Sequence, residues 1–99
     1  QFRGLGQEPG WRVDIDSEGL HWLGDYGDVE FSTGPPEAHR PSEGVMIWTA
    51  SADSHEIRVT AREELCRDVM SGHAFTHTVT VEVDGASYAG CGRWQEDAG

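Results

Sequence analysis

Two serines and three histidines are the side chains of this sequence that could perform nucleophilic catalysis. Ser51 or Ser71 could attack a substrate, with His55, His73 or His77 as the general base. The sequence contains no Gly-x-Ser-x-Gly turn and no other local signature that would fix a catalytic triad. A serine beside a histidine on a polar strand is commonly plain solvated surface. We therefore predict no catalytic residues and a protein that is not an enzyme.

Two of these histidines are spaced as metal ligands would be on a helix. His73 and His77 lie four residues apart. The Thr/Val alternation that begins at residue 76 predicts a strand instead, in which positions i and i+4 stand about 13 Å apart, too far for one ion. The sequence leaves open a site in which Asp68 or His73 meets His39 or His55 in the folded chain. We predict no bound metal and no cofactor.

The charge of the chain bears on its partners. It contains 18 Asp and Glu residues against 7 basic residues, all of them arginine, and its formal net charge is −11. Such a field repels nucleic acid and attracts basic proteins or cations, so we do not expect DNA or RNA binding. The alternative is that the acidic surface serves solubility, as in salt-adapted bacteria. Adjacent carboxylates such as Asp14 and Asp16 then form a solvated face rather than a glycosidase pair.

Four tryptophans in 99 residues are enough for a core, a binding surface or both. An indole ring buried in a thin core needs a partner for its N–H group. We expect Trp11 and Trp48 in the core. Trp22 and Trp94 could line a mouth or a binding surface. Trp22, Tyr26 and a histidine form the candidate small-ligand site.

The two cysteines, Cys66 and Cys91, bracket one strand-rich segment. An even cysteine count is compatible with one disulfide bond in an oxidising compartment. A bridge closing a loop of this length would add about 3.5 kcal/mol of stability in the chain-entropy model. The alternative is two unrelated buried thiols in a cytosolic protein. We expect the disulfide, because no Cys-x-x-Cys pair or Cys/His ligand spacing competes with it.

Most of the chain alternates between apolar and polar residues, which is the pattern of half-buried strands. The clearest example is residues 75–83, and Asp84-Gly85 after it is a strong signal for a two-residue hairpin turn. The apolar run 45–50 predicts a strand covered on both sides, or one at the centre of a barrel wall. Further strands are expected at residues 11–15, 20–23, 29–32, 56–61 and 87–91.

Three segments are expected to differ from this pattern. Residues 33–44 contain three prolines and two glycines, so we predict a long loop, either functional or a passive connection. Residues 61–70 have a helical composition and could form a short helix, and residues 94–99 are expected to fray. Residues 1–99 are predicted to form one small antiparallel all-β barrel or sandwich of about seven to eight strands.

Motifs at both ends of the sequence resemble those of a bacterial family. Glu8-Pro9-x-Trp11 stands near the start, and Cys66-x-Asp68-x-Met70-Ser71, Asp84-Gly85 and Gly90-Cys91 stand near the end. They are similar to an EPFW start and a CxDxMS…DG…GC end in small uncharacterised envelope proteins and lipoproteins. The resemblance implies export, a disulfide between Cys66 and Cys91, and a small β fold, but no established activity.

Charge, size and this resemblance together predict an exported binding or inhibitory module, located in the periplasm or at the outer membrane. A concrete form is an inhibitor of a basic cell-wall hydrolase such as lysozyme, whose cleft a loop would enter. The residues expected to bind the partner are Asp68, Ser71, His73, Pro36 and His39. For Asp68 and Ser71 the alternative is a structural role, in which the carboxylate accepts backbone N–H bonds in a turn.

Two other functions stay open: a small-ligand or metal-binding barrel, and a purely structural envelope module anchored by a lipid upstream. No run in the sequence approaches the ~20 apolar residues of a membrane span. No secretory signal is visible either.

Overall fold

The computed structural model describes residues 1–7, 9–68 and 71–95, which form eleven strands and one short 3₁₀ turn, Asp25–Gly27. The expectation of a small antiparallel all-β fold is confirmed, with more strands than the seven to eight predicted. The strands are β1 (Phe2–Gly6), β2 (Trp11–Ile15), β3 (Leu20–Gly24), β4 (Val29–Thr33), β5 (Glu37–Ser42), β6 (Val45–Ala52), β7 (His55–Arg62), β8 (Cys66–Arg67), β9 (Ala74–Phe75), β10 (His77–Val83) and β11 (Ala86–Trp94).

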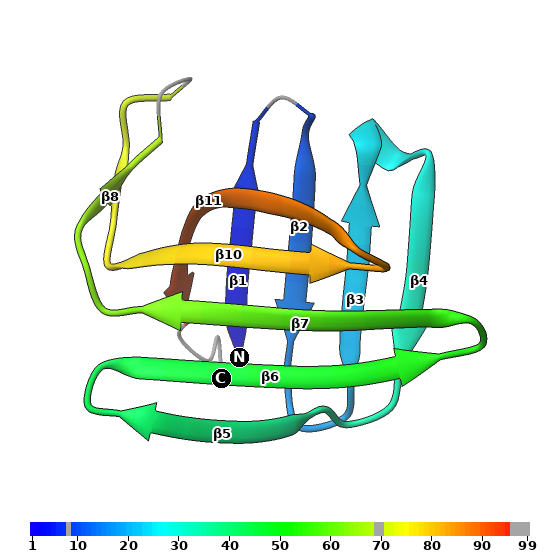
Figure 1. Cartoon of the computed structure of the whole chain (residues 1–99). Coiled ribbons are helices and arrows are strands. Elements are labelled where there is room, and N and C mark those ends of the chain that lie inside the picture. The colour runs from blue at the N-terminus through cyan, green and yellow to red at the C-terminus, as the bar shows by residue number, and fades with distance from the viewer. Residues whose placement is uncertain (8, 69–70, 96–99) are drawn as a thin grey trace.

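Nine of the strands form one curled antiparallel sheet, in the order β4-β3-β2-β1-β11-β10-β7-β6-β5. In Figure 1, β1 to β4 run steeply, and β5, β6, β7 and β10 run nearly at right angles to them, with β5 at the bottom. The two groups are joined through β11, which pairs with β10 on one side and with β1 on the other. The result is a half-barrel with its core between the two crossing groups. The strands β8 and β9 form a separate two-stranded sheet.

The corner of this half-barrel depends on glycines in β11. Residues 86–92 of β11 pair with β10, and residues 91–94 pair with β1. A Cβ atom on Gly90 would collide with the Leu5 carbonyl oxygen and would lie 2.8 Å from the Trp11 ring. One on Gly92 would lie 2.7 Å from Phe2 and Val79. Glycine therefore lets the bending strand approach β1 and two aromatic rings closely.

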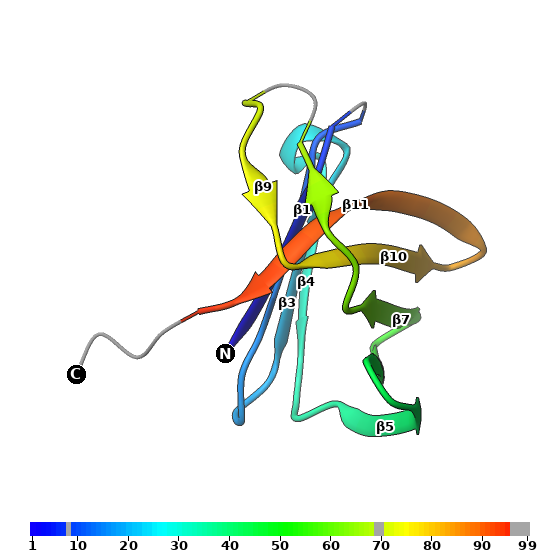
Figure 2. The ribbon, with the colours of Figure 1, turned by 90° about the vertical axis from the view of Figure 1, so that its left-hand side faces the viewer.

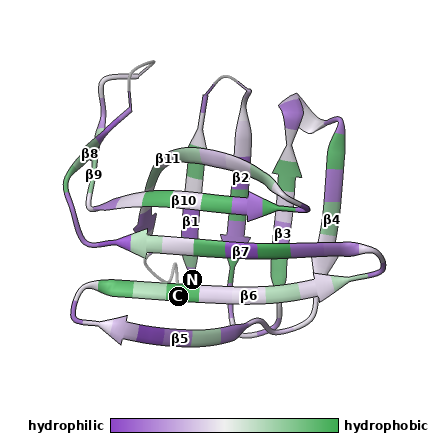
Figure 3. Ribbon diagram, viewed as in Figure 1, coloured by the Kyte–Doolittle hydropathy of each residue, from purple (hydrophilic) through white to green (hydrophobic). Residues whose placement is uncertain are grey.

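Strand alternation builds the core. In β2, β3, β7 and β10, buried residues recur at every second position, and Figure 3 shows this apolar–polar alternation along β7 and β10. Trp11 stacks on Trp22 with ring centroids 5.6 Å apart, and the Trp11 Nε1–H group donates to the carbonyl oxygen of Ala89 at 3.3 Å. Trp11 and Trp48 are both buried, as expected. The core residues are Phe2, Trp11, Val13, Ile15, Leu20, Trp22, Phe31, Trp48, Ile57, Val59, Ala61, Val79, Val81 and Val83.

The hairpin turn that the sequence indicated most clearly is present. Asp84 and Gly85 have φ values of 49° and 90°, as a two-residue hairpin turn requires, and connect β10 to β11. Asp16 closes the β2–β3 turn, because its Oδ1 accepts the backbone N–H groups of Glu18 and Gly19.

The predicted loop at residues 33–44 is wrong in its central part. Residues Glu37–Ser42 form β5, an edge strand of the sheet, and all six are exposed. Proline is tolerated here because an edge strand has one side without ladder hydrogen bonds. This edge position also corrects the prediction for residues 45–50. Their strand, β6, lies next to the edge, and Trp48 is its one buried residue.

Three further segments also differ from expectation. Residues 61–68 contain no helix: β7 continues to Arg62, and β8 follows at Cys66. The sequence did not predict β1, which pairs along its length with β2 and β11. The prediction that the frayed tail begins at Trp94 is wrong, because Trp94 pairs with Phe2 at the end of β11. Residues 96–99 lie outside the described residues. In the described ranges, no helix has the length and apolar character that crossing a bilayer requires.

Candidate functional site

A short hairpin projects from the half-barrel between β7 and β10. In it β8 pairs with β9, with Cys66 opposite Phe75 and Arg67 opposite Ala74. Figures 1 and 2 both show this hairpin extending beyond β10, away from β5. We call residues 65–68 and 71–75 the braced hairpin. Leu65 at its base is 76% exposed, which is unusual for a large apolar side chain in this molecule.

The base of the braced hairpin is bonded to the main sheet. Cys66 and Cys91 form a disulfide with their Cα atoms 5.5 Å apart, which confirms the expected bridge. Cys91 is buried on β11. The Arg93 guanidinium lies 5.5 Å from the centre of the Phe75 ring, which adds a cation–π contact between β11 and β9. A disulfide persists in an oxidising environment, so this bridge is compatible with an exported protein.

The turn of the braced hairpin is held by Asp68, which is 7% exposed. Its Oδ2 accepts the backbone N–H of Ser71 at 2.9 Å and the Ser71 hydroxyl at 2.8 Å. Its backbone N–H donates to the carbonyl oxygen of His73, and its own carbonyl oxygen accepts from Gly72. The Ser71 hydroxyl and then the Ser71 N–H stabilise the carboxylate, so the pKa of Asp68 is lowered. Asp68 and Ser71 thus have the structural role that the sequence left open as an alternative.

The five predicted partner-binding residues fall into two separated groups. Ser71 and His73 are exposed on the braced hairpin. His39 is exposed on β5 opposite Ile47, and Pro36 directly precedes that strand. Both views of the ribbon place β5 at the end of the molecule away from the braced hairpin. A single partner surface can therefore contact one of these two groups more easily than both at once.

The predicted ligand pair, Trp22 and Tyr26, does not form a mouth. Trp22 is fully buried, stacked on Trp11 and edge-on to Tyr88 at 5.0 Å between centroids. Burial, together with the nearby Asp25, raises the pKa of Tyr88. Tyr26 is 74% exposed, and its backbone N–H donates to the Gly10 carbonyl oxygen. Trp22 is a core residue because it lies two positions after the buried Leu20 and therefore points to the same face of β3.

Trp94 does line a pocket, but with residues that the sequence did not indicate. The pocket has a volume of about 140 Å³ and lies where the ends of β1 and β11 meet β5, β6 and β7. Its aromatic wall consists of Phe2, Trp48 and Trp94. The ring centroids of Phe2 and Trp48 are 5.0 Å apart, and Trp94 stands edge-on to both, at 5.3 Å and 5.8 Å. His77 stands edge-on to Phe2 at 5.5 Å.

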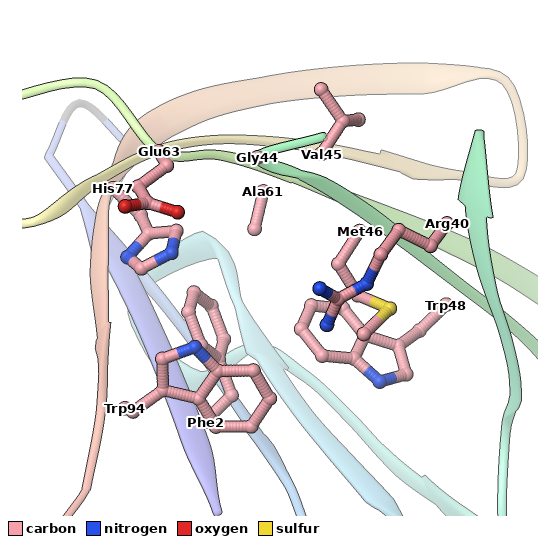
Figure 4. Close-up of a pocket in the computed structure, with 10 residues that line it drawn as sticks. All are labelled: Phe2, Arg40, Gly44, Val45, Met46, Trp48, Ala61, Glu63, His77 and Trp94. Carbon is pink, nitrogen blue, oxygen red and sulfur yellow. The ribbon is translucent and has the colours of Figure 1, made fainter. Parts of the chain in front are cut away.

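Two charged side chains complete this aromatic pocket. Figure 4 shows Glu63 and His77 on one side and Arg40, Met46 and Trp48 on the other, with the rings of Phe2 and Trp94 between them. The ion pairs of the described residues involve neither Arg40 nor Glu63. Sequence reasoning missed Phe2, Arg40 and Glu63, because the pocket forms only when six strands, β1, β5, β6, β7, β10 and β11, come together. The sequence does contain one signal for an irregular edge strand, which is Pro41 within a polar segment.

Two histidines of the described chain pair with single carboxylates. Within residues 1–7, 9–68 and 71–95, no three His, Cys, Asp or Glu side chains gather closely enough to hold an ion. Instead, His55 and His21 each contact one carboxylate at 2.6 Å, Asp84 and Glu30 respectively. The His55 hydrogen bond and the Glu56 N–H lower the pKa of Asp84.

The chain matches no protein-family model, no curated protein and no solved structure. The resemblance to small bacterial envelope proteins therefore stays a prediction.

Proposed function

We propose that this protein is a non-catalytic binding module that presents the braced hairpin to a basic protein partner. One observation supports the proposal: the hairpin is firmly held although it contributes no residue to the core. The core residues of the described chain all lie on strands of the nine-stranded sheet. Its base is bonded to β11 through Cys66, and its turn is tied by Asp68. A turn that is bonded in one shape and lies outside the core is well suited to recognition.

Rigidity favours such a role because binding orders flexible loops at a cost in entropy. A loop that is already held in its bound shape avoids most of that cost. The braced hairpin offers Leu65 as an exposed apolar contact, with Ser71 and His73 exposed near its turn. Asp68 contributes by fixing this shape.

The charge of the protein supports a basic partner. A net charge of −11 speeds encounter with a positively charged protein, and salt screens this attraction. A disulfide-bonded protein of this kind would act in the periplasm or at the outer membrane, where a basic cell-wall hydrolase such as lysozyme is a suitable partner. Cytosolic reducing conditions would work against the bridge.

The test is lysis of a cell-wall suspension by a basic lysozyme, with and without the protein, at low and at high salt. We expect inhibition at low salt that weakens as salt is added. Absence of inhibition at low ionic strength across several lysozyme types would overturn this partner class.

Two matched substitutions locate the contact surface. Leu65 and Tyr26 are exposed to nearly the same extent, 76% and 74%, but only Leu65 belongs to the braced hairpin. Leu65→Ser is expected to weaken inhibition, and Tyr26→Ser to leave it unchanged. Equal effects of the two substitutions would show that the braced hairpin is not the contact surface.

A further inference from the structure

The aromatic pocket described above has the features of a ligand site rather than of a packing defect. Of its three aromatic rings, Trp94 is 50% exposed, whereas Phe2 and Trp48 lie behind it and are 0% and 5% exposed. Its volume of about 140 Å³ is close to that of cavities that hold a benzene-sized molecule, about 150 Å³. The ligand that fits is therefore a small one.

A bulge in the edge strand places Arg40 at this pocket. His39 pairs with Ile47 and Ser42 pairs with Val45, so two residues of β5, Arg40 and Pro41, lie opposite Met46 alone. An extra residue of this kind turns the following side chains away from the normal alternation, and bulges occur often beside functional sites. Proline at position 41 fits the bulge because it has no N–H group to pair.

A contact with the β5–β6 turn places Glu63 on the side of the pocket opposite Arg40. Its backbone N–H donates to the Gly44 carbonyl oxygen at 2.7 Å, just after β7 ends. Gly44 has a φ of +78°, and a Cβ atom there would lie 3.5 Å from the Glu63 Cβ, so the β5–β6 turn and Glu63 are packed together. The backbone of Glu63 is thus fixed at the rim of the pocket, and none of the ion pairs of the described residues includes its carboxylate.

We propose that the aromatic pocket binds a small zwitterion, with a methylated ammonium group against the exposed ring of Trp94 and its anionic group near Arg40. Aromatic faces attract quaternary ammonium ions through their negative ring faces. Glu63 adds a full negative charge on the side where the ammonium would lie. A simple cation would leave Arg40 without a partner, and a simple anion would face Glu63 and the net charge of −11. A zwitterion satisfies both charged side chains.

The probe for the test is glycine betaine, titrated into the protein while NMR follows the four indole N–H signals. Trp94 and the buried Trp48 line the pocket, whereas Trp11 and Trp22 lie elsewhere in the core and serve as internal controls. We expect the Trp48 and Trp94 signals to shift in a saturable way and those of Trp11 and Trp22 to stay in place. Unmoved Trp48 and Trp94 signals at saturating betaine concentrations would overturn the proposal.

Two further ligands separate charge from shape. The compound 3,3-dimethylbutanoate has the shape of glycine betaine with carbon in place of nitrogen, and we expect it to bind about tenfold more weakly. Tetramethylammonium lacks the anionic group and is also expected to bind more weakly. If either ligand bound as tightly as glycine betaine, the zwitterion assignment would be wrong.

Matched substitutions test the two charged side chains. Glu63→Gln and Arg40→Gln are each expected to weaken betaine binding several-fold. Glu64→Gln changes the neighbouring exposed carboxylate, which does not line the pocket, and is expected to bind as the unaltered protein does. Equal binding by all three variants would show that the charged residues do not recognise the ligand.

Discussion

The rings of Phe31 and His55 stack with centroids 4.5 Å apart and planes within 2° of parallel. Phe31 lies on β4 and His55 begins β7, the first and the seventh strands in the order of the sheet. No ladder of backbone hydrogen bonds joins these two strands in the described chain. The stacked pair therefore closes the open side of the half-barrel with side chains alone.

Replacing His55 by alanine is expected to lower the free energy of unfolding by about 1 kcal/mol through loss of this aromatic pair. His21→Ala is the matched control. Both histidine side chains are 35% exposed, and both contact a carboxylate at 2.6 Å, but His55 alone stacks across the open side. Chemical denaturation of the two variants would measure the difference. Equal losses would mean that the stacked pair does not close the half-barrel.

Gly90→Ala should strongly destabilise the protein. The added methyl group would collide with the Leu5 carbonyl oxygen and the Trp11 ring at the corner of β11. We expect a loss of about 3 kcal/mol, as for other overpacked cores. Gly34→Ala is the control, because a methyl group there meets nothing within 4 Å and is expected to change stability by less than about 0.5 kcal/mol. Thermal unfolding of both variants tests this, and a stable Gly90→Ala variant would contradict the corner geometry.

The double substitution Cys66→Ala and Cys91→Ala removes the bridge between the braced hairpin and β11. The two cysteines are 25 residues apart, so the chain-entropy model gives a loss of about 3.5 kcal/mol. We expect the nine-stranded sheet to persist, since its ladders do not include β8 or β9. Amide hydrogen exchange should show lost protection at residues 66–68 and 71–75 first. Uniform loss across all strands would show that the bridge supports the whole fold.

Acid should loosen the braced hairpin through Asp68. Its pKa is lower in the folded state than in an unfolded chain, so its contribution to stability is fully present above about pH 4, the unfolded value, and is lost as the pH falls through the folded pKa. Ser71→Ala removes the hydroxyl donor but keeps the backbone donor, so the loss should begin at a higher pH than in the unaltered protein. An NMR titration that follows the backbone amide of position 71 in both proteins measures this directly. Identical midpoints would show that the hydroxyl does not stabilise the carboxylate.

Features decided by neighbouring residues could be predicted from the sequence. The Asp84-Gly85 turn and the alternating strands on either side of it are local, and they appear as expected. The buried position of Trp22 was also accessible, because it shares the parity of Leu20 in a strand with one face buried. Its size and partly polar ring suggested a binding role, and the strand pattern was the better guide.

Features decided by the whole sheet could not be predicted. Nothing local shows that residues 37–42 occupy an edge, where proline and six exposed residues are acceptable. The aromatic pocket needs Phe2 and Trp94, which stand near opposite ends of the sequence, to become cross-strand partners. Short, glycine-containing β1 also gave little signal, since its pairing partners make it a strand.

The pairing of Phe2 with Trp94 has a consequence for how this chain reaches its native state. Strand β1 obtains its second neighbour only when the last strand is available, so the final ladder joins contacts that are far apart in sequence. Proteins dominated by such distant pairings fold on the order of milliseconds to seconds, much more slowly than helical bundles. During synthesis the sheet remains incomplete until residues 91–94 have emerged. Strand β1 therefore stays an unpaired edge on one side for as long as β11 is not in place, which is the period in which it is most open to wrong pairings.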